Sequence, residues 1–95
     1  MNYINPFAQS GRWYPGNTNA HSTVSDGVRS VDECFEGYKR QRYDFLVLTD
    51  HSAISDVSQY SDESFLAISG SEFHPENPYG GTLYHIVAIS IHGKK

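Results

Sequence analysis

Residues 45–51 read Phe-Leu-Val-Leu-Thr-Asp-His, a continuous apolar run followed at once by an acid and a histidine. An apolar run of this length with polar residues on both sides is typical of a strand that is buried on both faces, as in a parallel sheet. We therefore expect a strand over Phe45–Thr49, with Asp50 and His51 at its carboxyl end.

The segment before this strand carries the clearest helix pattern, which we place from Val31 to Arg42. Ser30 and Glu33 form a capping-box pattern, in which each side chain accepts a hydrogen bond from a backbone N–H at the start of the helix. Acidic residues lie early and basic residues late, as the helix dipole favours. One face is apolar and belongs in the core; it consists of Val31, Cys34, Phe35 and Tyr38.

Other segments have weaker patterns. Asn17–Ser22 is a weak strand candidate, and Ser52–Ser64 is a short helix or a loop. Phe65–Ser69 is a strand that Gly70 stops. Before these segments, residues 1–15 form an irregular lead-in, which we expect Trp13 and Tyr14 to anchor to the body.

The last part of the chain predicts a loop over Phe73–Gly81 and a long β-branched strand over Thr82–Ile91. Alternation along that strand places His85 on one face with apolar residues. The order strand, helix, strand, connection, strand, strand predicts an α/β fold with a mainly parallel sheet.

Composition limits the classes of protein to consider. The chain has 95 residues, a formal charge of −4 and 14% aromatic residues, which fits one folded domain. It lacks the run of about 20 apolar residues that a membrane span needs, and its start has no signal-peptide pattern, so we expect a cytoplasmic protein that does not bind membranes. Seven Lys and Arg against eleven Asp and Glu give no strong nucleic-acid signal. The single Cys34 excludes an internal disulfide framework.

Polar side chains follow each of the first three predicted strands. His21 and Asp26 follow the first, Asp50 and His51 the second, and Glu72 the third. In α/β folds the functional groups gather at the carboxyl ends of the strands. His, Asp and Glu without sulfur ligands suit zinc, manganese or iron, so this placement predicts a divalent metal site.

Each of these residues also has a structural explanation when taken alone. His21 would be a surface or capping histidine, and Asp26 before Gly27 would be a turn residue. Asp50 would be a helix N-cap with His51 as its neighbour, and Glu72 would be a member of a surface ion pair. His85 inside an apolar face is a hydrogen-bonded core histidine. A polar cluster without metal is therefore the alternative interpretation.

Four segments in chain order resemble the motifs of the PHP family, the polymerase and histidinol phosphatase domain. They are residues 16–27 (GNTNAHSTVSDG), Leu48–His51 (LTDH), Gly70–Glu72 (GSE) and His85–Ala88 (HIVA). The resemblance spans Trp13 to about Ile91. It implies the N-terminal part of a distorted (β/α)7 barrel, and an enzyme that hydrolyses phosphoesters with two or three divalent metals, in which a metal-bound hydroxide attacks. Its implied substrate is a small phosphorylated compound or a nucleotide.

The resemblance also implies a set of metal ligands. His21 and Glu72 would bind a first metal, and Asp26 and His51 would serve a second. Glu72 would bridge the sites, and His85 would complete a second or third.

Two more residues of the implied site have different roles. Asp50, the catalytic partner of His51 in the second motif, would orient its neighbours rather than bind metal directly. His74 lies two residues after Glu72. It is either a substrate contact or a solvated loop histidine.

The sequence departs from the family pattern in two ways. Asn19 stands where the family has the first of two histidines separated by one residue, and an amide oxygen is a poor substitute for imidazole on zinc. This favours, as an alternative, a non-catalytic PHP-like module that has lost metal binding. The second departure is length, because a β/α barrel needs at least about 200 residues and this sequence has 95. A partial barrel leaves strand edges unpaired, so we expect self-association.

Overall fold

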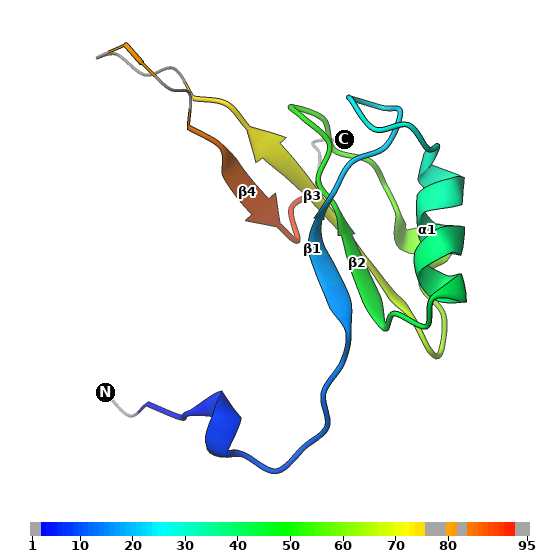
Figure 1. Ribbon diagram of the computed structural model, residues 1–95, viewed down its shortest axis with the longest axis vertical. Helices are drawn as coiled ribbons and strands as arrows, with labels where there is room; N and C mark the ends of the chain where they lie inside the picture. Colours follow the sequence, from blue (N-terminus) through cyan, green and yellow to red (C-terminus); the bar gives the residue numbers. More distant parts are fainter. Residues whose placement is uncertain (1–2, 76–79, 82–83, 93–95) are drawn as a thin grey trace.

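The structure is a computed structural model that describes residues 3–75, 80–81 and 84–92. The fold is α/β, with one helix against a curved, mixed sheet of four strands that lie in chain order (Figure 1). The elements are β1 (Gly16–Ala20), α1 (Val31–Arg40), β2 (Phe45–Leu48), β3 (Leu66–Phe73) and β4 (Ile86–Ile89), with 3-10 turns at Pro6–Ala8 and Ser58–Tyr60. β2 pairs in parallel with β1 and β3, whereas β3 and β4 are antiparallel. The mainly parallel α/β sheet is thus confirmed, and the PHP barrel stays a prediction.

α1 begins where the capping box predicts. Glu33 N donates to Ser30 Oγ over 3.2 Å, and Ser30 N donates to Glu33 Oε1 over 3.1 Å. The helix ends at Arg40, earlier than expected, because the chain turns there and Arg42 takes a left-handed φ of 63°. In the described part of the chain, no helix has the length and apolarity needed to cross a membrane.

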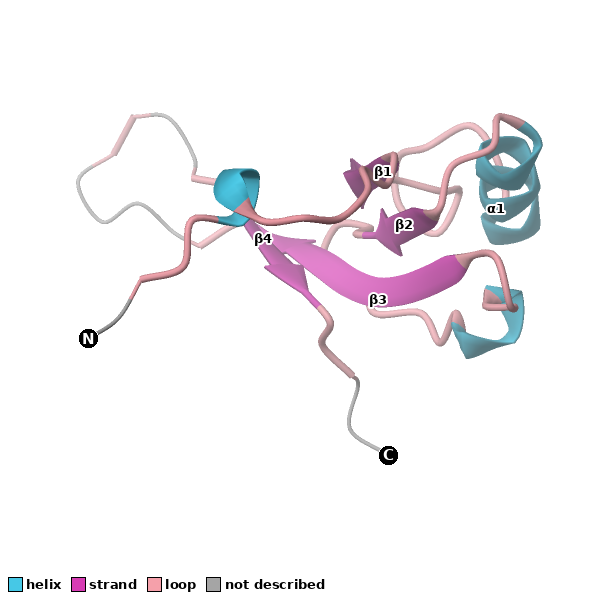
Figure 2. Ribbon diagram, turned by 90° about the horizontal axis from the view of Figure 1, so that it is seen from below, coloured by secondary structure: helices cyan, strands magenta, loops and turns pink. Residues whose placement is uncertain are grey.

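The core lies between α1 and one face of the sheet, as Figure 2 shows from below. Leu46 and Leu48 of β2 are almost fully buried, which confirms the expected central strand. Phe35 of α1 stacks on Tyr60 at 4.5 Å between ring centroids and meets Phe65 edge-on at 6.0 Å. Cys34 is also buried, as expected.

The predicted stop of β3 at Gly70 is wrong. The strand continues to Phe73 because Gly70–Phe73 pairs with Ile86–Ile89 of β4. A Cβ at Gly70 would lie 2.5 Å from the carbonyl oxygen of Ala88, so glycine is needed for the close approach of two strands.

β4 is shorter than the strand expected over Thr82–Ile91, and part of that segment, residues 82–83, lies outside the described residues. His85 precedes the strand instead of lying within it. Its expected apolar face is not buried, and Ile89 remains 47% exposed. β4 is an edge strand with β3 as its one neighbour among the described residues, and Ile86 and Val87 are exposed as well as Ile89.

Neither Trp13 nor Tyr14 anchors the lead-in in the core, although Asp44 N donates to Pro15 O over 2.7 Å where the lead-in meets β1. Trp13 is 82% exposed, and Tyr14 is exposed as well. The ring of Trp13 packs on Phe7 at 5.8 Å, within the lead-in itself. Figure 1 shows this segment, in dark blue, leaving the sheet before β1. Trp13 therefore finds a local partner instead of the core.

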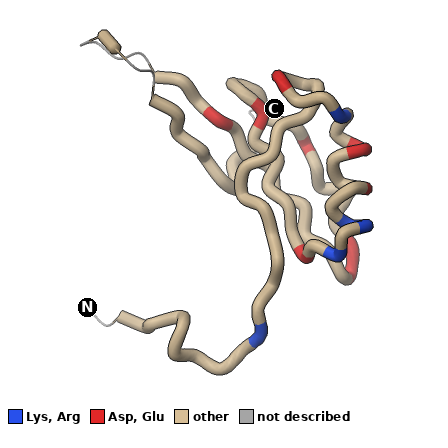
Figure 3. Tube along the Cα trace, in the orientation of Figure 1, with Lys and Arg blue, Asp and Glu red and all other residues tan. Residues whose placement is uncertain are grey.

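Charges are distributed unevenly along the fold. Lys and Arg gather on α1 and the segments beside it, apart from one in the lead-in (Figure 3). Asp and Glu are spread more widely and include a position on β3. The described basic residues are Arg12, Arg29, Lys39, Arg40 and Arg42.

Candidate metal centre

Backbone pairing continues past the end of β2 and places His51 beside Glu72. Thr49 N donates to Ala20 O over 2.8 Å, and Glu72 N donates to Asp50 O over 3.1 Å. His51 and Glu72 then form a parallel bridge. Side chains from the ends of β1, β2 and β3 therefore meet at one edge of the sheet, as expected for parallel strands.

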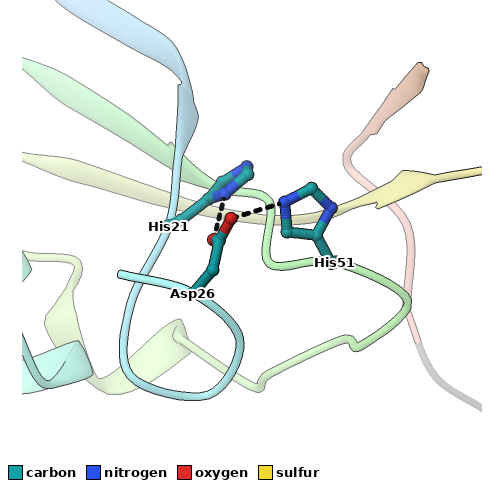
Figure 4. Close-up of side chains that lie close together, drawn as sticks. All are labelled: His21, Asp26 and His51. Atoms are coloured by element: carbon teal, nitrogen blue, oxygen red, sulfur yellow. Dashed lines mark hydrogen bonds and ion pairs between the residues drawn. The ribbon is translucent and has the colours of Figure 1, made fainter. Parts of the chain in front are cut away.

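Asp26 joins the imidazoles of His21 and His51 (Figure 4). His21 Nδ1 donates to Asp26 Oδ1 over 2.7 Å, and His51 Nε2 donates to Asp26 Oδ2 over 2.9 Å. The hydrogen bond from His21 is the main reason that the pKa of Asp26 lies below its ordinary value, and His51 lowers it further. The side chain of Asp26 is 62% exposed. An ionised carboxylate thus holds both rings at the mouth of the site.

Glu72 is the centre of a second group, and its side chain is only 7% exposed. Oε1 accepts a hydrogen bond from Asn19 Nδ2 over 3.0 Å and lies 3.5 Å from His21 Nε2. Oε2 lies 3.2 Å from His51 Nδ1 and 3.5 Å from His85 Nδ1. The hydrogen bond from Asn19 is the largest cause of the lowered pKa of Glu72, and the three nearby histidines add to it against the opposing effect of burial.

His74 belongs to this cluster and is not a solvated loop residue. Its Nε2 contacts His51 Nδ1, and the two rings stack at 4.4 Å. It also meets His85 edge-on at 4.3 Å. The signal that could have found it is its spacing from Glu72, because residues i and i+2 of an extended chain share a face. The spacing places both side chains on one face only if the chain stays extended past Gly70, where a stop was expected.

Asp50 is buried and lies outside both groups of donors. It accepts hydrogen bonds from Ser22 N over 2.7 Å, Ser22 Oγ over 2.6 Å and Ser25 Oγ over 2.6 Å. Burial raises the pKa of Asp50, but these hydrogen bonds outweigh burial and hold it below its ordinary value. Asp50 therefore fixes the turn that connects His21 to Asp26.

Asn19 lies between Thr49 and Glu72. Its Oδ1 accepts a hydrogen bond from Thr49 Oγ1 over 3.3 Å, while its Nδ2 donates to Glu72. The amide thus presents an N–H, and not its oxygen, to the carboxylate.

The described residues contain two groups of donors whose ligand atoms lie within 4.8 Å of one another: His21, Asp26 and His51, and then His51, Glu72 and His74. His85 lies beside the second group. His21 Nε2 is buried and has no hydrogen-bond partner in the described part of the chain. A buried nitrogen without a partner is unfavourable, and a cation would supply one. The donor types and this unpaired atom fit a divalent metal ion.

A cavity of about 490 Å³ adjoins the first group. His21 and Asp26 form part of its wall, and Arg29, Tyr38 and Tyr43 form another part. Its volume is in the range of small-ligand sites.

Comparisons of the chain with family models, curated proteins and solved structures find no match in any of the three.

Proposed function

We propose that this chain carries a divalent metal centre of the PHP type that serves phosphoester hydrolysis. One observation carries the proposal: imidazole nitrogens from three segments converge on buried Glu72, and one of them, His21 Nε2, has no hydrogen-bond partner among the described residues. A structural polar cluster is expected to satisfy its own buried atoms. A metal site leaves lone pairs for the ion.

The donors that would hold metal are the residues that the resemblance implies, together with His74. They are His21, Asp26, His51, Glu72, His74 and His85. A divalent ion supplies Lewis acidity, which makes a nucleophile available from water near pH 7 and neutralises charge on phosphoryl oxygens. The chain's own part is to fix the donors: Asp26 holds two imidazoles, and Asp50 holds the turn between His21 and Asp26.

The proposed substrate is a small phosphorylated compound or a nucleotide. The cavity beside His21 and Asp26 supports a small substrate by its volume. Arg29 in its wall offers a cation for phosphate, and Tyr38 and Tyr43 offer aromatic surface. The resemblance to a family of phosphoesterases points to the same class.

The test combines elemental analysis with hydrolysis of p-nitrophenyl phosphate in the presence of zinc, manganese or iron. Wild type should retain at least one ion per chain and release p-nitrophenol. Glu72→Gln should lose both properties, because it removes the charge at the centre of the donors. Glu63→Gln removes an exposed carboxylate elsewhere and should change neither. A wild-type chain that retains no ion would rule out the proposal.

Asn19 favours a second candidate, a PHP-like module that binds no metal and catalyses nothing. Its amide already occupies Oε1 of Glu72. If this candidate is right, Asn19→His should raise zinc affinity sharply from a negligible value. Tight zinc binding by the wild-type chain would exclude it, whereas an ion bound without hydrolysis would leave a metal-binding module.

A further inference from the structure

We propose that one ion of this centre binds on the Oε2 side of Glu72, with His74 as a ligand beside His51, and that Asp26 positions His51 for this ion instead of binding it. This inference rests on the metal centre proposed above. His74 lies between the third and fourth segments that resemble PHP motifs, and in neither of them. It is therefore a ligand that the resemblance does not supply.

The first argument concerns the two nitrogens of His51. Its Nε2 lies 2.9 Å from Asp26 Oδ2, and an ionised carboxylate can only accept a hydrogen bond. The proton of a neutral His51 ring is therefore on Nε2, and its one lone pair is on Nδ1. Nδ1 is the atom that faces Glu72 and His74. A carboxylate that orients a ligating histidine through its far nitrogen is a common arrangement at metal sites.

Because it has a single lone pair, His51 can serve only one of the two donor groups at a time. Ligation with Asp26 would require the proton to leave Nε2 and would break the existing hydrogen bond. Ligation with Glu72 and His74 keeps that bond. The second group is also the better shielded, since the side chain of Glu72 is 7% exposed and that of Asp26 is 62% exposed.

The second argument concerns the two oxygens of Glu72. Oε1 accepts an N–H from Asn19, whose own oxygen accepts from Thr49. An ion at Oε1 would meet the N–H of that amide and would have to displace it. The described neighbours of Oε2 are instead imidazole nitrogens, from His51 and His85. An ion at Oε2 leaves the hydrogen bond from Asn19 intact.

The third argument is the direct contact between His74 Nε2 and His51 Nδ1. Because His51 Nδ1 carries a lone pair, His74 Nε2–H is the donor in this contact. An ion near Oε2 would take the place of that proton, which would move to His74 Nδ1 or be released, and both nitrogens could then point a lone pair at the ion. Two imidazoles and a carboxylate, with His85 Nδ1 beside the same oxygen, are a donor set that suits tetrahedral zinc. His74 thus adds an imidazole on the Oε2 side of Glu72. On the Oε1 side, Asn19 supplies an amide instead of an imidazole.

The experiment is a titration of the metal-depleted chain with Zn²⁺ and with Co²⁺, whose visible spectrum reports its ligands. His74→Ala should weaken Zn²⁺ binding by more than about 100-fold and change the Co²⁺ spectrum. Asp26→Asn should weaken binding by roughly 10–100-fold, as loss of an orienting partner does, and leave the Co²⁺ spectrum unchanged. His92→Ala, an exposed histidine outside the cluster, is the matched control and should match wild type.

A second measurement uses wild type alone and does not depend on the folding of a variant. Long-range ¹H–¹⁵N spectra of the Zn²⁺-loaded chain should show His51 ligated through Nδ1 and protonated at Nε2, and His74 ligated through Nε2. Ligation of His51 through Nε2, or equal Zn²⁺ affinity of wild type and His74→Ala, would overturn the inference and leave the proposed function standing. If wild type binds no Zn²⁺, Mn²⁺ or Fe²⁺, the proposed function is itself overturned, and the inference with it.

Discussion

The buried carboxylate of Asp50 holds Ser22 at two points, accepting from its backbone N–H over 2.7 Å and from its hydroxyl over 2.6 Å. Ser22 directly follows His21, so these bonds fix the backbone that carries a proposed ligand. A third hydrogen bond, from Ser25, ties down the same turn close to Asp26. Asp50 thus acts on the site through the chain and not through contact with an ion.

We expect Asp50 and Ser22 to be energetically coupled. Asp50→Ala and Ser22→Ala should each destabilise the fold by about 1–3 kcal/mol, because each leaves buried polar groups without a partner. The double variant should cost less than the sum, with a coupling of about 0.5–3 kcal/mol. Urea unfolding of the four proteins measures this cycle, and strictly additive costs would contradict it.

Two glycine-to-alanine variants should change stability in opposite directions. A Cβ at Gly27 would lie 2.4 Å from the backbone oxygen of His21, so Gly27→Ala should cost about 1–3 kcal/mol and weaken zinc binding. At Gly37, in α1, the nearest atom to a Cβ is Arg29 Nη1 at 3.7 Å. Gly37→Ala should therefore stabilise by about 0.5–1 kcal/mol. Thermal unfolding checks both variants. A Gly27→Ala variant with the same melting temperature as wild type would show that the turn has room for a Cβ and would contradict the prediction.

Asp62 should make stability depend on pH in the acid range. Hydrogen bonds from Ser64, then from Lys39, lower the pKa of Asp62 from 3.8 to about 2. Because the folded-state pKa is depressed, the stabilising contribution is fully present above pH 3.8 and is lost as the pH falls through about 2. The difference in melting temperature between wild type and Asp62→Asn should therefore shrink over that window.

The control for this experiment is Glu63→Gln. Glu63 is exposed and has no hydrogen bond or ion pair in the described part of the chain. Its melting-temperature difference from wild type should stay constant between pH 2 and pH 7. A constant difference for Asp62→Asn as well would contradict the role given to its hydrogen bonds.

Self-association is expected through the open edge at β4. Exposed Ile89 lies on this edge strand, whose outer backbone groups have no partner strand among the described residues. Sedimentation velocity should show concentration-dependent association of wild type, and Ile89→Lys should reduce it. Ile54→Lys places the same charge on an exposed isoleucine in a loop and should leave association unchanged. A strictly monomeric wild type at high concentration would refute this expectation.

Local patterns predicted the helix and the first parallel strands well. The capping box of Ser30 and Glu33 marked the start of α1, and the apolar run from Phe45 marked β2. Both signals lie within a few residues of the element that they predict. The end of α1 was less clear, because Arg42 and not a glycine takes the left-handed conformation there.

Features that depend on distant partners could not be predicted in the same way. Gly70 looks like a strand breaker by itself, yet it lies inside β3 because β4 pairs across it. The same pairing extends the strand towards His74, which then meets His51. The alternation that placed His85 on an apolar face was also misleading, since β4 is short and exposed. By contrast, the meeting of His21, Asp26, His51 and Glu72 follows from the carboxyl ends of neighbouring strands, and their positions in sequence predicted it.

The contact between His51 and His74 has a consequence for folding. It joins positions 23 apart in the chain, which follow β2 and β3. An ion held there would bind the folded chain, in which these side chains meet, and not the unfolded chain, so its binding free energy would add to the stability of the fold. Cys34 is the chain's single cysteine, so the sequence offers no internal disulfide for this purpose. Metal uptake would then be coupled to folding, and the residues that bind the ion would also help to keep a small core assembled.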